Sequence, residues 1–329
     1  MLLAADQAEA AEVTVDAAAR HQTIEGWGTC MINWSLSNTP YQDPAWRQAY
    51  RDLGLNILRM DLEKSVLVDA SGDMSVPVAL GADLAANVAQ MDFTKSETQV
   101  FGDMAAWLAQ NALEPERVRI VGSVWSPPHW MKGPTGATPY HVTNPAVEHP
   151  TPWLRTTGDS IGGRLLQTPQ NLEQFGRYIA GWATGFEQQY GVPLYAISIQ
   201  NEITFENPFD SATYATGPNG ESDQHWQYAD ALAAVKAEFE ANSITTRIKG
   251  PHMANVGESP DNPWALRHQL LFIEAVKDHA DPTLIDFLDF YGSNGYMGTD
   301  EGAVQAWAGY LHGQAAVSAN WADWVDVPG

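Results

Sequence analysis

An amide and a carboxylate come directly after an apolar segment in the middle of the chain. The segment runs from Tyr195 to Ile199 and is followed by Gln200, Asn201 and Glu202. A strand buried in a parallel sheet delivers its last residues to the rim of that sheet, where active sites are built. Glu202 is therefore the candidate proton donor of a catalytic site. The alternative is that this glutamate only caps the next helix or is solvated at the rim.

An arginine and an aspartate stand two residues apart in another expected strand. Arg59 and Asp61 share one face of the sheet, because side chains in a strand alternate with a period of two. An arginine inside a sheet must be paired. Its partner is expected to be Asp61, Glu63 or a catalytic carboxylate.

Tryptophans stand at two further expected strand ends. Residues 125–132 read Trp-Ser-Pro-Pro-His-Trp-Met-Lys, in which two prolines force a rigid extended exit flanked by Trp125 and Trp130. Trp27 lies between two glycines, which let a ligand or a neighbouring backbone approach closely. A flat indole held in place suits the C–H face of a sugar. Most of the 13 tryptophans of the chain must nevertheless be ordinary packing.

Apolar segments closed by polar residues or glycine alternate with helix-like segments, and this alternation predicts α/β layering around a parallel sheet. Strands are expected at residues 23–33, 55–62, 117–125, 194–202, 247–253 and 285–296. Helices are expected at residues 44–53, 96–113, 168–190, 222–241, 263–280 and 301–317.

Two other segments stand out in this alternation. The best-defined helix has Thr168 as its cap and Pro169 at its first position, and it ends before Gly191. A long segment at residues 133–163 is rich in Gly, Pro and Thr and follows the third strand. Such a loop on the rim is often functional.

Length and composition bound the possible classes of protein. The 329 residues suffice for one large α/β barrel or two ordinary domains, and 44% of them are hydrophobic. With 40 acidic and 17 basic residues, the net charge of −23 makes nucleic acid and anionic lipid poor partners. No segment has the apolar length that a membrane span needs, so no membrane insertion is expected.

The single cysteine and the amino terminus carry weaker signals. A lone Cys30 excludes an internal disulfide and is expected to be a small core residue. Residues 1–12 are Ala-rich and lack the basic and apolar regions of a signal peptide. They are expected to form a disordered tail, and they do not demonstrate secretion.

Four motifs together resemble glycoside hydrolase family 30, a member of the retaining (β/α)8-barrel clan A. They are residues 26–28, 53–59, 125–132 and 196–202. The resemblance implies an α/β fold, a (β/α)8 TIM-type barrel formed by residues 13–329, of which about six βα units are present. Residues 13–15 would then be a strand of a missing side β-domain. The resemblance further implies that the protein is secreted and acts on a β-linked oligo- or polysaccharide or the glycan of a glycolipid. A monomer is expected.

Site roles follow from the resemblance, residue by residue. Glu202 would be the acid/base, Asn201 would bond the sugar 2-hydroxyl, and Arg59 would hold the carboxylate of the nucleophile. Tyr296 would donate its hydroxyl to that nucleophile. Asn294 stands where the family often has a histidine, so the substrate contact there departs from the pattern.

A retaining glycosidase needs two carboxyl groups about 5 to 5.5 Å apart, one ionised to attack and one protonated to assist the leaving oxygen. Burial and the negative nucleophile are expected to raise the pKa of Glu202, which keeps its proton available near neutral pH. Once the glycosyl ester forms, that negative charge is gone and Glu202 can ionise to activate water.

The nucleophile of the resembled family is a glutamate at the end of the seventh strand, and nothing after Tyr296 fits that pattern. Asp326 is the only late acid with strand-like neighbours, and Glu301 lies at an expected helix start. The expectation is therefore that the chain is truncated at its C-terminal side, lacks the nucleophile and is inactive alone. The substrate stays open among β-glucosides, xylans, β-1,6-glucans and β-1,6-galactans.

Two other functions compete with hydrolysis by paired carboxyls. A non-catalytic carbohydrate-binding barrel would keep the rim tryptophans and tolerate the loss of one carboxyl. A metal-dependent hydrolase would need clustered histidines, and the chain has neither H-x-H nor HExxH spacing, so no metal and no cofactor is expected. Five histidines are expected to be loop or rim residues satisfied by hydrogen bonds: His129, His141, His149, His225 and His252.

Overall fold

The computed structural model describes residues 24–31, 40–73, 76–133, 163–203, 211–214, 225–254, 265–294 and 322–325. The expected tail at residues 1–12, the strand at 13–15 and the helix at 301–317 lie outside these ranges.

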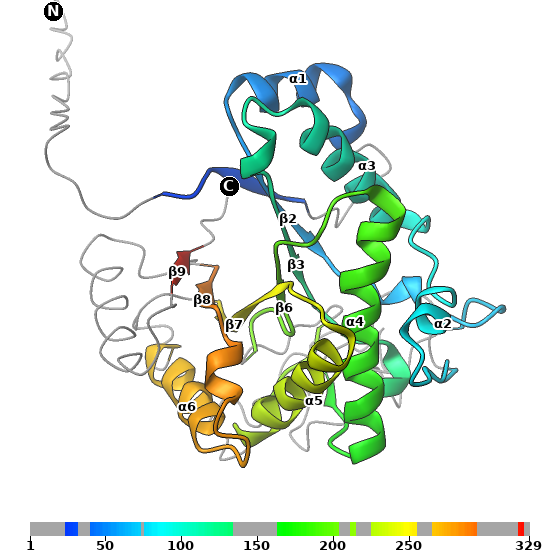
Figure 1. Ribbon diagram of the computed structural model, residues 1–329, viewed down its shortest axis with the longest axis vertical. Helices are drawn as coiled ribbons and strands as arrows, with labels where there is room; N and C mark the ends of the chain where they lie inside the picture. The colour runs from blue at the N-terminus through cyan, green and yellow to red at the C-terminus, as the bar shows by residue number, and fades with distance from the viewer. Residues whose placement is uncertain are drawn as a thin grey trace, which may run out of the picture.

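A sheet of seven parallel strands forms the centre of the molecule (Figure 1). The order of the strands across the sheet is their order along the chain. A barrel wall has this order, whereas in a doubly wound sheet the order reverses at one point. This arrangement confirms the expected partial TIM-type barrel. The strands are β1 (Gly28–Met31), β2 (Ile57–Asp61), β3 (Arg119–Ser123), β6 (Ala196–Ser198), β7 (Arg247–Met253), β8 (Phe290–Ser293) and β9 (Ala322–Val325).

The seventh strand, β9, was not among the expected strands and pairs in parallel with β8. A separate antiparallel pair joins β4 (Lys132–Gly133) to β5 (Arg164–Leu165), on either side of the segment rich in Gly, Pro and Thr. Most of that segment, residues 134–162, lies outside the described ranges.

The helices lie outside the row of strands, from α1 at the top of Figure 1 through α3, α4 and α5 to α6 at the bottom. Within the described ranges, no helix combines the length and the apolar character that crossing a bilayer requires. The helices are α1 (Pro44–Asp52), α2 (Leu84–Val88), α3 (Ser96–Asn111), α4 (Pro169–Tyr190), α5 (Trp226–Asn242) and α6 (Ala265–Lys277). Short 3-10 helices occupy Pro40–Gln42, Lys64–Val66, Pro115–Arg117, His129–Met131 and Leu284–Phe287.

The ends of α4 follow the expected sequence signals. The Thr168 side chain accepts a hydrogen bond from the backbone N–H of Asn171, and Pro169 occupies the first helical position. Gly191 ends the helix in the left-handed conformation, with φ of 70°, which glycine adopts without steric cost. Local sequence therefore fixes both ends of the longest helix in the described ranges.

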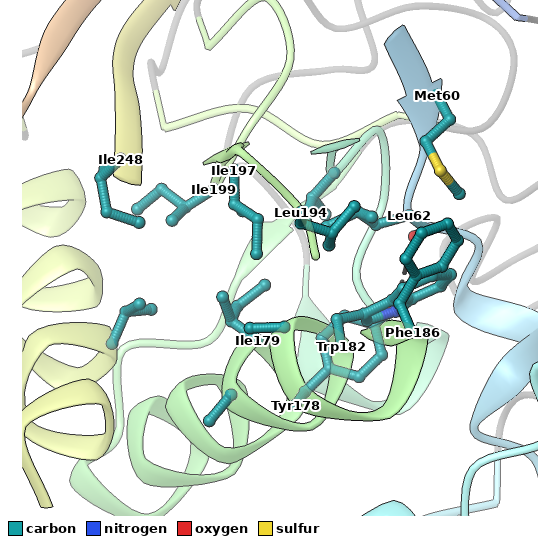
Figure 2. Packing of buried hydrophobic residues seen from close by; sticks show 14 of the residues in the cluster. Met60, Leu62, Tyr178, Ile179, Trp182, Phe186, Leu194, Ile197, Ile199 and Ile248 are labelled. Carbon is teal, nitrogen blue, oxygen red and sulfur yellow. Dashed lines mark hydrogen bonds between the residues drawn. The ribbon is translucent and has the colours of Figure 1, made fainter. Parts of the chain in front are cut away.

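The main hydrophobic core lies between α4 and the strands (Figure 2). Ile179 and Trp182 of α4 face Ile197 of β6, and all three side chains are fully buried. Burying side chains of this size contributes about 1.5–3 kcal/mol each. A separate small cluster of Val121, Ala196 and Phe290 lies apart from this core. The sheet is thus anchored to its helices by one apolar face, and the strand ends are left for polar side chains.

Candidate active site

The backbone beyond β6 carries the two central residues of the site. The N–H of Asn201 donates to the carbonyl of Val124, just past β3, at 2.7 Å, and the N–H of Ile203 donates to the carbonyl of His252 on β7 at 3.1 Å. Glu202, between them, has a φ of 48°, in the left-handed region that residues other than glycine rarely adopt. Strain of this kind concentrates at functional sites. Hydrogen bonds to both neighbouring strand ends hold Asn201 and Glu202 at the carboxyl end of the sheet.

Asn294 contacts Glu202 directly. The amide Nδ2 of Asn294 donates to Oε1 of Glu202 at 2.7 Å and to Oδ1 of Asn201 at 3.3 Å. Asn294 is itself held at the end of β8 by a backbone bond from its N–H to the carbonyl of Met253. All three polar side chains are buried. The position at which the resemblance implied a histidine therefore supplies an amide donor to the carboxyl group.

Arg59 reaches the same cluster from β2. Its guanidinium is buried and, among the described residues, donates to three side chains: Oδ1 of Asn201, Oγ of Ser123 at 3.2 Å and Sγ of Cys30 at 3.1 Å. Arg59 thus fixes the oxygen of Asn201. Cys30 is exposed, and the expectation of a buried core cysteine is wrong, because β1 is an edge strand of the described sheet.

The carboxylates expected near Arg59 make other contacts. Oδ1 of Asp61 accepts from the backbone N–H of Trp125 at 3.3 Å. A carboxylate oxygen of Glu63 lies 4.0 Å from Nζ of Lys64. Both carboxylates lie at or just beyond the carboxyl end of β2.

The amide of Asn201 has one end occupied and one end open. Its Oδ1 accepts from both Arg59 and Asn294. Among the described residues, no protein group accepts a hydrogen bond from its Nδ2. This nitrogen can therefore donate to a ligand hydroxyl beside Glu202.

The two tryptophans expected on the rim differ in their surroundings. Trp125 is buried, and the guanidinium carbon of Arg59 lies 5.9 Å from its ring centroid, which places the ring beside the cluster. Trp130 is partly buried and packs against the main hydrophobic core, and it is not among the side chains hydrogen-bonded around Glu202. The structure thus places Trp125 beside the cluster, and the substrate contact expected of Trp130 stays a prediction.

Trp27 lies at the opposite end of the sheet, and its expected place on the rim is wrong. The strand begins only at Gly28, and the carbonyl of Trp27 accepts from the N–H groups of Asn56 and Ile57, where β2 begins. A Cβ on Gly28 would lie 1.7 Å from the carbonyl oxygen of Ile57. Glycine therefore serves the close approach of the neighbouring backbone here. Trp27 does not belong to the cluster around Glu202.

His252 is the residue that sequence reasoning missed. It was expected on a loop or rim, but it lies within β7, fully buried, with Nε2 2.7 Å from Oδ1 of Asn294. Burial holds the pKa of His252 well below its usual value, and the positive charges of Lys249 and Arg59 lower this pKa further. The available signal was its position near the end of the expected strand at residues 247–253, level with the other polar strand ends.

Three candidates lie outside the described residues: Tyr296, Glu301 and Asp326. Within the described ranges, no three His, Cys, Asp or Glu side chains gather in a way that could hold a metal ion.

Solved structures of glycoside hydrolases share this fold. A family 30 subfamily 8 xylanase from Clostridium acetobutylicum is 17% identical, with a TM-score of 0.50 over 94% of this chain and 66% of its own. The catalytic domain of a family 30 xylanase from Talaromyces cellulolyticus is 15% identical, with a TM-score of 0.53 over 95% of this chain and 69% of its own. An endo-β1,6-glucanase is 16% identical, with a TM-score of 0.56 over 94% of this chain and 58% of its own.

These likenesses show that the chain has the TIM-type barrel fold of family 30 glycoside hydrolase structures. The sequence itself matches no protein-family model and no curated protein. The chain spans 58% of the length of the glucanase and 66% of the length of the bacterial xylanase.

Proposed function

We propose that the protein is a retaining glycoside hydrolase of family 30 that cleaves β-linked glycans, with Glu202 as its acid/base. The observation that carries the proposal is the buried pair of Asn201 and Glu202 at the carboxyl end of β6, held by Arg59 and Asn294. Barrel enzymes build their active sites at this end of the sheet.

The hydrogen bond from Asn294 gives the two oxygens of Glu202 different roles. Oε1 accepts from the amide, at 2.7 Å. A proton carried by the carboxyl group is then favoured on Oε2, from which it can pass to the leaving oxygen of the glycan. After the glycosyl ester has formed, ionised Glu202 takes a proton from the attacking water.

Asn201 supports the substrate side of this step. Its Nδ2 is open among the described residues and adjoins Glu202 along the chain, so it can donate to a sugar hydroxyl next to the bond that breaks. Hydrogen bonds to the 2-hydroxyl strengthen in the transition state and contribute to its stabilisation.

The second carboxyl group of the mechanism is assigned in this proposal to a residue outside the described ranges. The resemblance implies a glutamate after the seventh strand, and the seventh strand here is β9, which ends at Val325. External formate can stand in for a missing carboxylate nucleophile, so the role of Glu202 can be tested independently of that residue.

The test is hydrolysis of β-linked substrates by the native protein and by Glu202→Gln, with and without added formate. Xylan and β-1,6-glucan oligosaccharides come first in the panel because the structural neighbours include xylanases and an endo-β1,6-glucanase. We expect Glu202→Gln to lose about 10²–10⁴-fold in kcat/KM on substrates with poor leaving groups. Glu114→Gln, which removes an exposed carboxylate ion-paired with Arg117, is the matched control and should keep native activity.

Two outcomes contradict the proposal. A binding-only barrel would give the same glycan affinity in native and Glu202→Gln proteins and no hydrolysis in either, with or without formate. If hydrolysis depends on the protein's own nucleophile, NMR of the first product must show retained anomeric configuration, and inversion would exclude the retaining mechanism.

A further inference from the structure

A fully buried histidine stands behind the amide that contacts Glu202. His252 lies on β7, and its Nε2 is 2.7 Å from Oδ1 of Asn294. The other end of the same amide donates to Glu202. The imidazole, the amide and the carboxyl group therefore form one line of hydrogen bonds across the ends of three strands.

Which atom donates and which accepts in each of these hydrogen bonds can be deduced by starting from Arg59. A guanidinium has only donors, so the atom of Asn201 that faces Arg59 must be its oxygen. The atom of Asn294 that faces this oxygen must then be its NH2 group, and the oxygen of Asn294 is left facing His252. An oxygen can only accept, so Nε2 of His252 must carry the proton.

We infer that His252 is a positioning residue for the acid/base step: its Nε2–H holds the amide of Asn294 with NH2 toward Oε1 of Glu202. The inference rests on the proposed function of Glu202. With the amide turned the other way, its oxygen would face the carboxyl group and accept the acidic proton. That proton would then be directed to Asn294 instead of the leaving oxygen of the glycan.

The charge state of the imidazole is consistent with this role. Burial holds the pKa of His252 well below its usual value, with the charges of Lys249 and Arg59 acting in the same direction. The lowered pKa favours the neutral ring, whose single N–H is then the one on Nε2 that donates to Asn294.

The first test needs no turnover. ¹⁵N NMR of the native protein reports which imidazole nitrogen carries the proton, and the His252→Gln spectrum assigns the signals of His252. We expect a neutral ring with the proton on Nε2 throughout about pH 5 to 8. A proton on Nδ1 alone would overturn the inference while leaving the proposed function untouched, because Nε2 could then not donate to Asn294.

The second test compares substrates with good and poor leaving groups, because only poor leaving groups need the acid. His252→Leu removes the donor, and His252→Gln keeps an NH2 donor near the position of Nε2. We expect His252→Leu to lose about 10–100-fold in kcat/KM on poor leaving groups, with little change on activated aryl glycosides, because kcat/KM reports the first half-reaction, in which the acid acts. His252→Gln should recover most of that loss. His225→Gln is the matched control, because His225 is a buried histidine that packs on Phe272.

The two levels of the account fail in different ways. Equal losses on both substrate classes, or no recovery in His252→Gln, would show that His252 is only structural. If Glu202→Gln loses as much kcat/KM on activated aryl glycosides as on substrates with poor leaving groups, the proposed function of Glu202 fails. The His252 variants do not affect that conclusion.

Discussion

The barrel wall carries a polar network at each end, and the two networks differ in burial. At the amino end, the ring of Tyr195 lies between the guanidinium groups of Arg119 and Arg247, at 4.8 and 5.0 Å from its centroid. Its hydroxyl donates to Glu25 at 2.9 Å. Arg247 is 46% exposed, and Glu25 is also exposed.

At the carboxyl end, every member of the network is buried. Arg59, Asn201, Glu202, Asn294 and His252 are each at most 6% exposed. Every hydrogen-bonded pair among them includes a side-chain amide of Asn201 or Asn294, and Arg59 fixes the direction of those bonds.

The comparison separates two uses of similar chemistry. Exposed ion pairs and hydrogen bonds are screened by water and contribute about 0–1 kcal/mol each. Removing the partner of a buried polar group lowers the free energy of unfolding by about 1–3 kcal/mol. The amino-end network is therefore expected to contribute little to stability, whereas removing a member of the buried carboxyl-end network should cost more.

The largest effect is expected for Arg59→Met. This variant removes one of the two buried donors to Oδ1 of Asn201 and the Arg59 donor to Oγ of Ser123, so the free energy of unfolding should fall by about 3 kcal/mol. Urea unfolding measures it through the midpoint at constant m-value. Arg247→Met is the amino-end counterpart and should lose less than about 1 kcal/mol. Equal losses would remove the distinction between the two ends.

The second effect is a pH dependence of stability. The folded state keeps His252 neutral because burial lowers its pKa, whereas the unfolded chain takes up a proton as the pH falls below about 6.5. The contribution is fully present above that pH and decreases on acidification, by up to about 1.4 kcal/mol per pH unit. Between pH 7 and 5, His252→Gln should show a correspondingly flatter unfolding curve. Parallel curves for the two proteins would contradict the assignment.

The smallest effect is expected for Tyr195→Phe. It removes the hydroxyl that bridges Glu25 and Arg247 at the exposed end, so the free energy of unfolding should change by less than about 1 kcal/mol. Tyr178→Phe is the buried counterpart, since it removes a hydroxyl that donates to the carbonyl of Leu62 at 3.2 Å. Its loss should be about 1–2 kcal/mol. Thermal unfolding of the pair decides whether burial sets the difference.

Sequence predicted the elements whose signals are local. The cap at Thr168 and the glycine at Gly191 gave α4 nearly to the residue. Strand ends were predicted less well, because the run of apolar residues in the sequence continues beyond the last residue that is hydrogen-bonded to a neighbouring strand. The expected strand at residues 194–202 is the shorter β6, and the backbone turns away at Glu202 with its positive φ.

The site residues that could be predicted are polar residues at the ends of apolar strand segments. Arg59, Asn201, Glu202 and Asn294 were expected in the site and lie together. Trp27 was misplaced because a Gly-Trp-Gly run has the same pattern before a strand as after it. His252 was missed because a lone histidine has no characteristic spacing, and only the parallel register brings it to Asn294.

The central claim is that Glu202 faces the bond that breaks in a β-linked glycan. A crystal structure of Glu202→Gln with a bound β-linked oligosaccharide tests it without requiring turnover. The account predicts a glycosidic oxygen at about 2.7–3.2 Å from the side chain at position 202, on the side away from Asn294, with a sugar hydroxyl accepting from Nδ2 of Asn201. An oligosaccharide bound elsewhere on the molecule, with position 202 pointing away from it, would contradict the account.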